Sequence, residues 1–326
     1  MQALVLNEYD TALEVTEIDT PEAGPGQVLV RTAASGVNPL DIKIRTGKAA
    51  HAKRVLPAVL GLDLAGVVET VGETVTGFAP GDEVYGLTGG VGDLQGSLAE
   101  YAAVDAQLLA HKPAALALRE AAALPLVTIT AWEGLVDRAR VGPGDKVLVH
   151  GGAGGIGHVA IQIALAHGAE VFATGSPSKL ATISGLGATP IDYTAEDVGQ
   201  YTDVHTRGEG FDIVFDTVGG ATLDASFAAV RTYSGRVVSA LGWGTHSLAP
   251  LSFRGASYSG VFSLLPMLSG RGRAHHGEIM AKATTLVDKG VLKPLVDGRH
   301  FTFETVADAY ALVASGRAMG KVVVDV

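Results

Sequence analysis

Hydrophobic residues occur in three different arrangements along the chain. In the first third, short apolar segments at residues 27–32, 64–71, 83–85 and 98–104 are separated by breaks rich in glycine or proline. Such segments are typical of β-strands joined by turns. Residues 1–121 therefore predict a mostly β domain.

From residue 122 to 264, short apolar runs alternate with segments of helical periodicity. The runs lie at residues 147–149, 171–174, 213–215, 236–240 and 259–262. Strands that alternate with helices form a parallel sheet covered by helices. This region therefore predicts an α/β fold with a doubly wound parallel sheet.

The last part of the chain returns to a mixed pattern. Helical periodicity occurs near residues 278–289 and 306–315, and a strand-like run closes the chain at residues 321–326. Because chain ends are often close together, we expect residues 265–326 to complete the domain formed by residues 1–121.

The segment KVLVHGGAGGIG, from Lys146 to Gly157, carries the strongest motif of the chain. An apolar strand runs into a glycine turn with the pattern G-x-G-x-x-G, and apolar residues at helical spacing follow it. In this context such a turn binds the pyrophosphate of a dinucleotide. We expect contacts from the turn residues Gly152, Ala153, Gly154, Gly155, Ile156 and Gly157.

The end of the next strand indicates which dinucleotide is bound. A site for NAD usually has an acidic residue here, which bonds the ribose 2′-hydroxyl, but residues 174–179 read TGSPSK. The next acidic residue, Asp192, comes only after a further helix, so we expect no carboxylate that would repel a phosphate. Ser176 and Lys179 can donate to a 2′-phosphate. NADPH is therefore favoured over NADH, although Lys179 is alternatively a solvated helix residue.

Composition narrows the classes of function. The 326-residue chain has no cysteine, 47% hydrophobic residues and a net charge of −10. The missing cysteines exclude disulfides, thiol catalysis and thiolate-bound metals, and the negative charge argues against nucleic-acid binding. No apolar run reaches membrane-spanning length, and the chain begins directly with strand-like sequence, so we expect a cytoplasmic protein without a membrane partner.

Four segments carry a family resemblance. ASGVNPLDIK at residues 34–43, GLDLAGVV at 61–68, PGDEV at 80–84 and the glycine turn occur in the order seen in medium-chain dehydrogenases/reductases. The chain resembles the zinc-free quinone oxidoreductase branch over nearly its whole length. The resemblance implies a homodimer built from a GroES-like catalytic domain (1–121, completed by 265–326) and a Rossmann NADP(H)-binding domain (122–264).

The chain departs from zinc-dependent relatives at the metal ligands. Those relatives have Cys where Asn38 stands and Gly-His-Glu where residues 61–63 read Gly-Leu-Asp. Asp41 and Asp63 are left as carboxylates, whereas catalytic zinc normally has three protein ligands. We therefore expect no metal.

Without a Lewis acid to lower the pKa of an alcohol, reduction of a conjugated acceptor is the easier chemistry. Hydride goes to a conjugated carbon, and hydrogen-bond donors stabilise the charge that develops on oxygen. We expect a zinc-independent NADPH:quinone oxidoreductase that acts on a small molecule. Two alternatives stay open: a reductase of enals and enones, and a nucleotide-bound regulatory or RNA-binding protein, of which the net charge disfavours RNA binding.

The resemblance also implies individual roles. Asn38 stands at the substrate-side position, where its amide bonds the acceptor oxygen or the nicotinamide ribose; alternatively, it caps the turn before Pro39. Lys43 stands where several quinone reductases have Tyr, and is either a stabiliser of the oxyanion or a solvated helix residue. Further cofactor contacts are expected from Thr130, Tyr193, Val218, Ala240, Leu241, Gly242 and Lys321.

Overall fold

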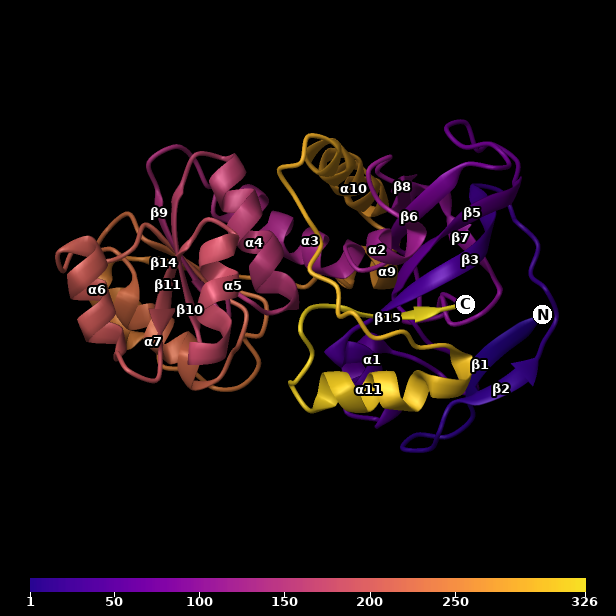
Figure 1. Ribbon diagram of the computed structural model, residues 1–326, viewed down its shortest axis with the longest axis horizontal. Coiled ribbons are helices and arrows are strands. Elements are labelled where there is room, and N and C mark those ends of the chain that lie inside the picture. Colours follow the sequence, from indigo (N-terminus) through magenta and orange to yellow (C-terminus); the bar gives the residue numbers. More distant parts are fainter. The chain divides into compact units, whose positions relative to one another are not determined.

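The computed structural model describes all residues from 1 to 326, and the chain divides into two compact units (Figure 1). Unit 1 comprises Met1–Ile129 and Leu264–Val326, and unit 2 comprises Thr130–Ser263. The first division falls within helix α3, Pro125–Trp132. The change of sequence pattern near residue 121 therefore marks the start of a helical segment and not the point at which the chain enters unit 2.

Unit 1 is built on two antiparallel sheets. The larger has the strand order β15-β3-β5-β6-β8, with β7 paired to β3, and the smaller has the order β2-β1-β4. The strands of the larger sheet are β3 (Gln27–Val37), β5 (Asp63–Val71), β6 (Glu83–Leu87), β7 (Tyr101–Asp105), β8 (Leu109–His111) and β15 (Val322–Asp325). Those of the smaller sheet are β1 (Gln2–Leu6), β2 (Glu14–Glu17) and β4 (Ala58–Val59).

The mostly β character predicted for this region is confirmed, but β3 is longer than the predicted strand at residues 27–32. Its second half, from Ala33 to Val37, reads AASGV and consists mostly of small residues with low strand propensity. These residues pair with β5 on one side and β15 on the other. Pairing on both edges therefore outweighs local propensity.

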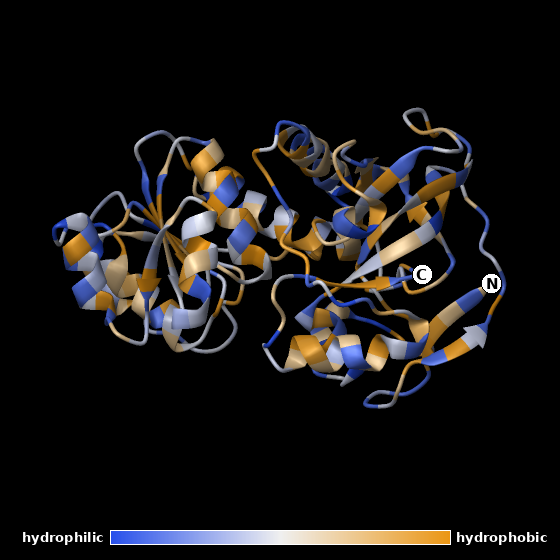
Figure 2. Cartoon of the chain, viewed as in Figure 1, coloured by the Kyte–Doolittle hydropathy of each residue, from blue (hydrophilic) through white to orange (hydrophobic).

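Helices of different lengths connect and cover these strands. Helix α1 (Pro39–Arg45) follows β3 directly, with Asn38 at its N-cap position and proline as its first residue. The others are η1 (Ala50–Ala52), η2 (Ala106–Leu108), α2 (Leu118–Ala121), α9 (Leu265–Ser269), α10 (Arg273–Asp288), η5 (Phe303–Thr305) and α11 (Val306–Ala314). In Figure 2, α11 carries both hydrophobic and hydrophilic residues, as expected for a helix with one buried face.

Strand β15, at the end of the chain, is the edge strand of the larger sheet of unit 1. It pairs antiparallel with the end of β3, with Val322 opposite Val37 and Asp325 opposite Ala34. Lys321 precedes β15, and Asn38 follows β3. The register therefore brings Lys321 beside Asn38, although the two residues are far apart in the sequence.

Unit 2 contains one parallel six-stranded sheet with the order β11-β10-β9-β12-β13-β14. Its strands are β9 (Lys146–His150), β10 (Glu170–Gly175), β11 (Thr189–Asp192), β12 (Ile213–Asp216), β13 (Arg236–Ser239) and β14 (Ser257–Gly260). The order is that of a doubly wound dinucleotide-binding sheet. Strand β14 begins two residues before the predicted run at 259–262, and β11, which contains Pro190, was not predicted.

A π-helical segment, η3 (Glu133–Arg138), precedes the first strand of this sheet, and helices connect the successive strands. The connecting helices are α4 (Gly155–Ala166), η4 (Pro177–Lys179), α5 (Leu180–Gly185), α6 (Val198–Thr206), α7 (Ala221–Ala229) and α8 (Ala249–Arg254). Their apolar faces pack with buried strand residues such as Leu148, Val214 and Val237. None of the helices of the protein is long and apolar enough to cross a membrane.

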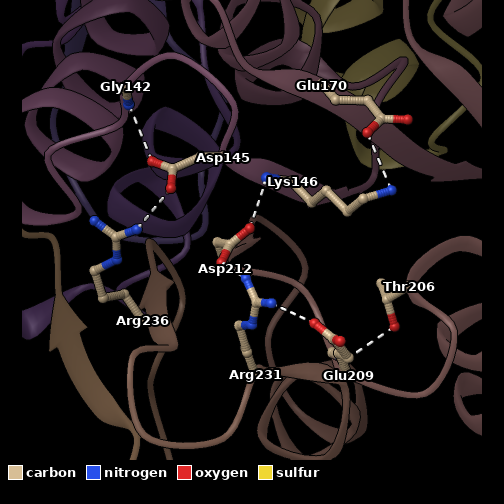
Figure 3. A network of polar contacts seen from close by, with 10 residues as sticks. Gly142, Asp145, Lys146, Glu170, Thr206, Glu209, Asp212, Arg231 and Arg236 are labelled. Atoms are coloured by element: carbon tan, nitrogen blue, oxygen red, sulfur yellow. Dashed lines mark hydrogen bonds and ion pairs between the residues drawn. The ribbon is translucent and has the colours of Figure 1, made fainter.

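Ion pairs close the amino ends of this sheet (Figure 3). The Nζ of Lys146 lies 3.0 Å from the carboxylate of Glu170, and Arg231 bonds both Asp212 and Glu209. These charged side chains at the amino edge are therefore paired with one another.

Candidate functional site

The glycine turn of unit 2 has the geometry that the motif predicts. Strand β9 ends at His150, and Gly154 is the N-cap residue of α4. The first N–H groups of a helix have no partner inside it, so the start of α4 can receive an anion. The turn therefore fits a pyrophosphate.

The three motif glycines have different local environments. A Cβ on Gly157 would lie 2.1 Å from the carbonyl oxygen of Gly151, and a Cβ on Gly152 would lie 2.6 Å from the side chain of Ala173. A Cβ on Gly154 would approach only the carbonyl oxygen of Gly151, at 3.1 Å. Gly152 and Gly157 are therefore required by packing, whereas Gly154 leaves open space beside the helix start.

The predicted phosphate-binding residues lie beyond β10 and β11. Ser176 precedes η4, Lys179 is the last residue of η4, and both are half-buried. Tyr193 follows β11, and its side chain is exposed. Asp192 is opposite Gly175 in the register of these strands. The prediction that no carboxylate lies near the end of β10 is therefore wrong, because the sheet places the next strand end beside it. The Oδ1 atom of Asp192 accepts hydrogen bonds from the backbone and hydroxyl of Thr194.

The neighbouring strand ends form the rest of the carboxyl edge. Buried Asp216 accepts hydrogen bonds from the backbone N–H groups of Val218 and Gly219 and from the hydroxyl of Ser239. These bonds fix the turn after β12 and leave the side chain of Val218 exposed. The predicted contacts after β13 are half-buried or exposed, namely Ala240, Leu241 and Gly242.

Two buried polar residues also belong to unit 2. Thr130 donates from its hydroxyl to that of Ser263 at 3.3 Å. His150 has one ring nitrogen 3.3 Å from the hydroxyl of Thr174, and its Nε2 has no partner. Burial lowers the pKa of His150 to about 4, although Asp216 acts in the opposite direction. The imidazole is therefore neutral at pH 7.

Unit 1 contains a buried, hydrogen-bonded cluster of Asn38, Asp63 and Lys321. Lys321 donates to the side-chain oxygen of Asn38, to the backbone oxygen of Val37 at 3.1 Å and to Asp63 at 3.3 Å. The side-chain nitrogen of Asn38 donates to Asp63 at 2.9 Å and to the backbone oxygen of Gly36 at 3.3 Å. All three donors of the ammonium and both donors of the amide are therefore used inside unit 1.

Asp63 is completely buried at the centre of this cluster. Its second carboxylate oxygen accepts the backbone N–H of Leu126 at 2.7 Å. Burial raises the pKa of Asp63, and the ammonium of Lys321, the amide of Asn38 and the N–H of Leu126 act in the opposite direction. Sequence reasoning considered Asp63 only as a metal ligand. The sequence signal for this buried role is a charged residue between uncharged, nonpolar neighbours. Asp63 shows this pattern, and so does Lys321 before β15.

Asp41 lies next to this cluster and fixes the start of α1. Its carboxylate accepts the backbone N–H of Asn38 at 2.8 Å. Burial raises the pKa of Asp41 to about 7, and nearby Asp63 contributes in the same direction. Asn38 itself occupies the N-cap position, but its side chain makes no cap hydrogen bond.

Lys43 lies on the same helix and is exposed. Its ammonium makes no hydrogen bond or ion pair within the protein. Partial burial, and then the positive charge of Lys43, lower the pKa of His51. Lys43 is thus a cation with free donors, in contrast to Lys321.

The residues present do not fit a zinc ion. The protein has no cysteine and no group of three or more His, Asp or Glu side chains that could hold a metal. At the positions discussed for zinc-dependent relatives, Asn38 and Asp63 bond one another and the ammonium of Lys321. A cation already lies against both side chains.

Two family models match this chain. Residues 24–114 match the alcohol dehydrogenase GroES-like domain, and residues 186–324 match a model described as zinc-binding dehydrogenase. The NADPH-dependent alkenal/one oxidoreductase of Arabidopsis thaliana, described as chloroplastic, is 37% identical over 335 residues, which cover 99% of this chain and 79% of that protein.

Solved structures of dehydrogenases and reductases are also similar to this chain. An alcohol dehydrogenase superfamily protein from Novosphingobium aromaticivorans is 55% identical, with a TM-score of 0.98 and coverage of 100% of this chain and 99% of that one. The quinone oxidoreductase from Coxiella burnetii is 29% identical, with a TM-score of 0.84 and coverage of 100% and 99%. The chain therefore belongs to the medium-chain dehydrogenase/reductase family and is one of its zinc-free members.

Proposed function

We propose that the protein is an NADPH-dependent reductase of α,β-unsaturated carbonyl compounds. The observation that carries this proposal is the exposed ammonium of Lys43, which has free donors for a developing oxyanion. The relative that is named as an alkenal/one oxidoreductase supports the acceptor class. The quinone acceptor expected from the sequence is kept as the second candidate, supported by the similarity to a quinone oxidoreductase.

Unit 2 is proposed to bind NADPH. The start of α4 would bind the pyrophosphate, and Ser176, Lys179 and Tyr193 would contact the 2′-phosphate. Because Asp192 lies at the end of the adjacent strand, the preference for NADPH depends on Lys179 more strongly than the sequence indicated. Thr130 in α3, Val218 after β12 and the residues after β13 remain proposed contacts of the cofactor.

When bound, NADPH would supply the hydride that reduces the conjugated carbon of the acceptor. The electron pair of the carbon–carbon double bond moves toward the carbonyl oxygen, and Lys43 is proposed to donate a hydrogen bond to that oxygen. A proton from water, or from Lys43, completes the reduction at the neighbouring carbon. In a quinone, the same donor would stabilise the hydroquinone oxygen.

Asn38 is proposed to position α1 and not to touch the acceptor oxygen. Both of its amide N–H groups are used by Gly36 and Asp63, and the residue is 1% exposed. The acceptor oxygen needs a hydrogen-bond donor, and the Asn38 amide has no unused N–H group. Its N–H and carbonyl instead connect the start of α1 to the buried cluster.

A substrate panel tests this function. NADPH oxidation is measured with an enal, a cyclic enone and a benzoquinone, and with NADH in place of NADPH. Oxidation of an alcohol with NADP⁺ is measured with and without a chelator. We expect turnover of the enal or enone with NADPH. Failure of every enal, enone and quinone despite tight NADPH binding would overturn the enzyme assignment and favour a nucleotide-bound regulatory protein.

We also propose a cytoplasmic homodimer, without nucleic-acid or membrane partners. Strand β14 is an edge strand with exposed residues, and an unpaired strand edge can pair with a second copy. Sedimentation of the purified protein tests the dimer, because a monomer at micromolar concentration would contradict it.

A further inference from the structure

The cluster of Asn38, Asp63 and Lys321 contains one negative and one positive side chain, both buried. Lys321 is 5% exposed and Asp63 is fully buried. A buried charge is costly unless an opposite charge and hydrogen bonds compensate it. Here the carboxylate receives donors from Lys321, Asn38 and Leu126. The pair is therefore balanced within unit 1 and needs no further ion.

The two charges also determine how the Asn38 amide is oriented. An ammonium can only donate and a carboxylate can only accept. The amide oxygen must therefore face Lys321 and the amide nitrogen must face Asp63, as the hydrogen bonds show. Removal of both charges would allow the amide to rotate.

Asn38 connects this cluster to helix α1. Its backbone N–H bonds Asp41 in the first turn, and Lys43 lies two residues further along the same helix. The exposed ammonium of Lys43 is thus carried by a short helix whose start is held by buried polar contacts.

We propose that Lys321 is an internal cation that, together with Asp63, positions Lys43 through Asn38 and the first turn of α1. This assignment replaces the expected role of Lys321 as a cofactor contact, and its catalytic part rests on the proposed function. It also explains the mismatch with zinc, since an ammonium of the chain itself bridges Asn38 and Asp63.

Unfolding measurements test the buried pair. Lys321→Met and Asp63→Asn should each lower the melting temperature by roughly 10 °C, because each leaves a buried charge without its partner. The melting temperature of the double variant should fall less than that of either single variant, because no buried charge is left without a partner. Lys146→Met is the matched control at a partly exposed ion pair, with an expected loss of about 2 °C or less. Additive losses in the double variant would overturn the pairing.

Kinetic measurements test the positioning role. The folded double variant Asp63→Asn/Lys321→Met should bind NADPH within about threefold of the wild type, while its kcat falls about tenfold. In a Lys43→Met background the same double substitution should lower kcat by no more than about twofold, because the two effects act through one group. If the double substitution lowers kcat by the same factor in both backgrounds, the buried pair does not act through Lys43. A large loss of NADPH affinity in a folded Lys321→Met variant would instead assign Lys321 to the cofactor.

Two further results separate this inference from the proposed function. Zn²⁺ should not raise the melting temperature of the wild type, and a rise would show that the cluster accepts a metal. If the wild type reduces no enal, enone or quinone, the proposed function fails, whereas the unfolding experiment still decides whether Lys321 and Asp63 form a balanced pair.

Discussion

The buried cluster of unit 1 and the carboxyl edge of the sheet in unit 2 use similar polar residues in opposite ways. In the cluster, every donor of Lys321 and of the Asn38 amide has a partner in the protein. At the carboxyl edge, the start of α4 has unpaired N–H groups and His150 has a ring nitrogen without a partner.

This difference separates polar residues that stabilise the fold from polar residues that are available to bind a ligand. Where polar groups satisfy one another, a substitution leaves an unpaired group and is expected to reduce stability. Where polar groups are left open, a substitution is expected to reduce ligand affinity while the fold persists. The following substitutions test that division, from the largest expected effect to the smallest.

Asp41→Asn should remove a pH-dependent part of the stability of unit 1. The pKa of Asp41 is raised from 3.8 to about 7, so the folded protein binds this proton more tightly than the unfolded chain. The contribution is present below about pH 4 and is lost as the pH rises through 7. It amounts to at most about 4 kcal/mol, at about 1.4 kcal/mol per pKa unit. Urea unfolding from pH 4 to 8 measures it.

The groups that face Asp41 set the sign of this effect. Burial and the charge of Asp63 favour the neutral form, whereas Lys321 and the backbone N–H groups of Asn38 and Gly61 favour the charged form. Exposed Asp308 provides the control, as Asp308→Asn. A stability difference between wild type and Asp41→Asn that is constant over the pH range would contradict the assignment.

Gly157→Ala and Gly154→Ala compare two glycines of the same turn. The new Cβ at residue 157 would collide with the carbonyl oxygen of Gly151, so we expect a loss of about 2–3 kcal/mol in unfolding free energy. At residue 154 the fold should be retained within about 1 kcal/mol, because φ is −79° and the space is open. NADPH affinity should nevertheless fall about tenfold or more, since the methyl group obstructs the approach of the pyrophosphate. Equal NADPH affinity in wild type and Gly154→Ala would argue against this binding mode.

Lys43→Met should reduce kcat for an enone by about 10- to 100-fold and leave the Kd for NADPH unchanged. The loss is expected because no other donor on α1 is assigned to the oxyanion. Lys48→Met is the control, since Lys48 is an exposed lysine shortly after the helix. Stopped-flow reduction with saturating NADPH measures the effect, and an unchanged rate would show that Lys43 is only a solvated residue.

Lys179→Met should raise the KM for NADPH by about tenfold and leave the KM for NADH nearly unchanged. The reason is that the 2′-phosphate is present only in NADPH. Steady-state kinetics with both cofactors measure the ratio. If the KM values for NADPH and NADH rise equally, Lys179 does not recognise the phosphate, and Asp192 would then be the residue to examine.

Much of the fold could be read from local patterns. The alternation of apolar runs and helical segments predicted the parallel sheet of unit 2, because a strand covered on both faces must be apolar. Strand β11 was missed because Pro190 and its short length give little strand signal. The extension of β3 was missed because pairing on both edges, and not propensity, forms it.

The sequence by itself determined the glycine turn, the absence of thiolate ligands and the family resemblance, since these depend on residue type and local spacing. Only the tertiary structure decided which charged residues meet. The antiparallel register of β15 with β3 brings Lys321 to Asn38, and the parallel register of β10 with β11 brings Asp192 to Gly175. Neither neighbour is close in the chain. Strand pairing joins residues of any sequence separation, so no local pattern could have identified these contacts.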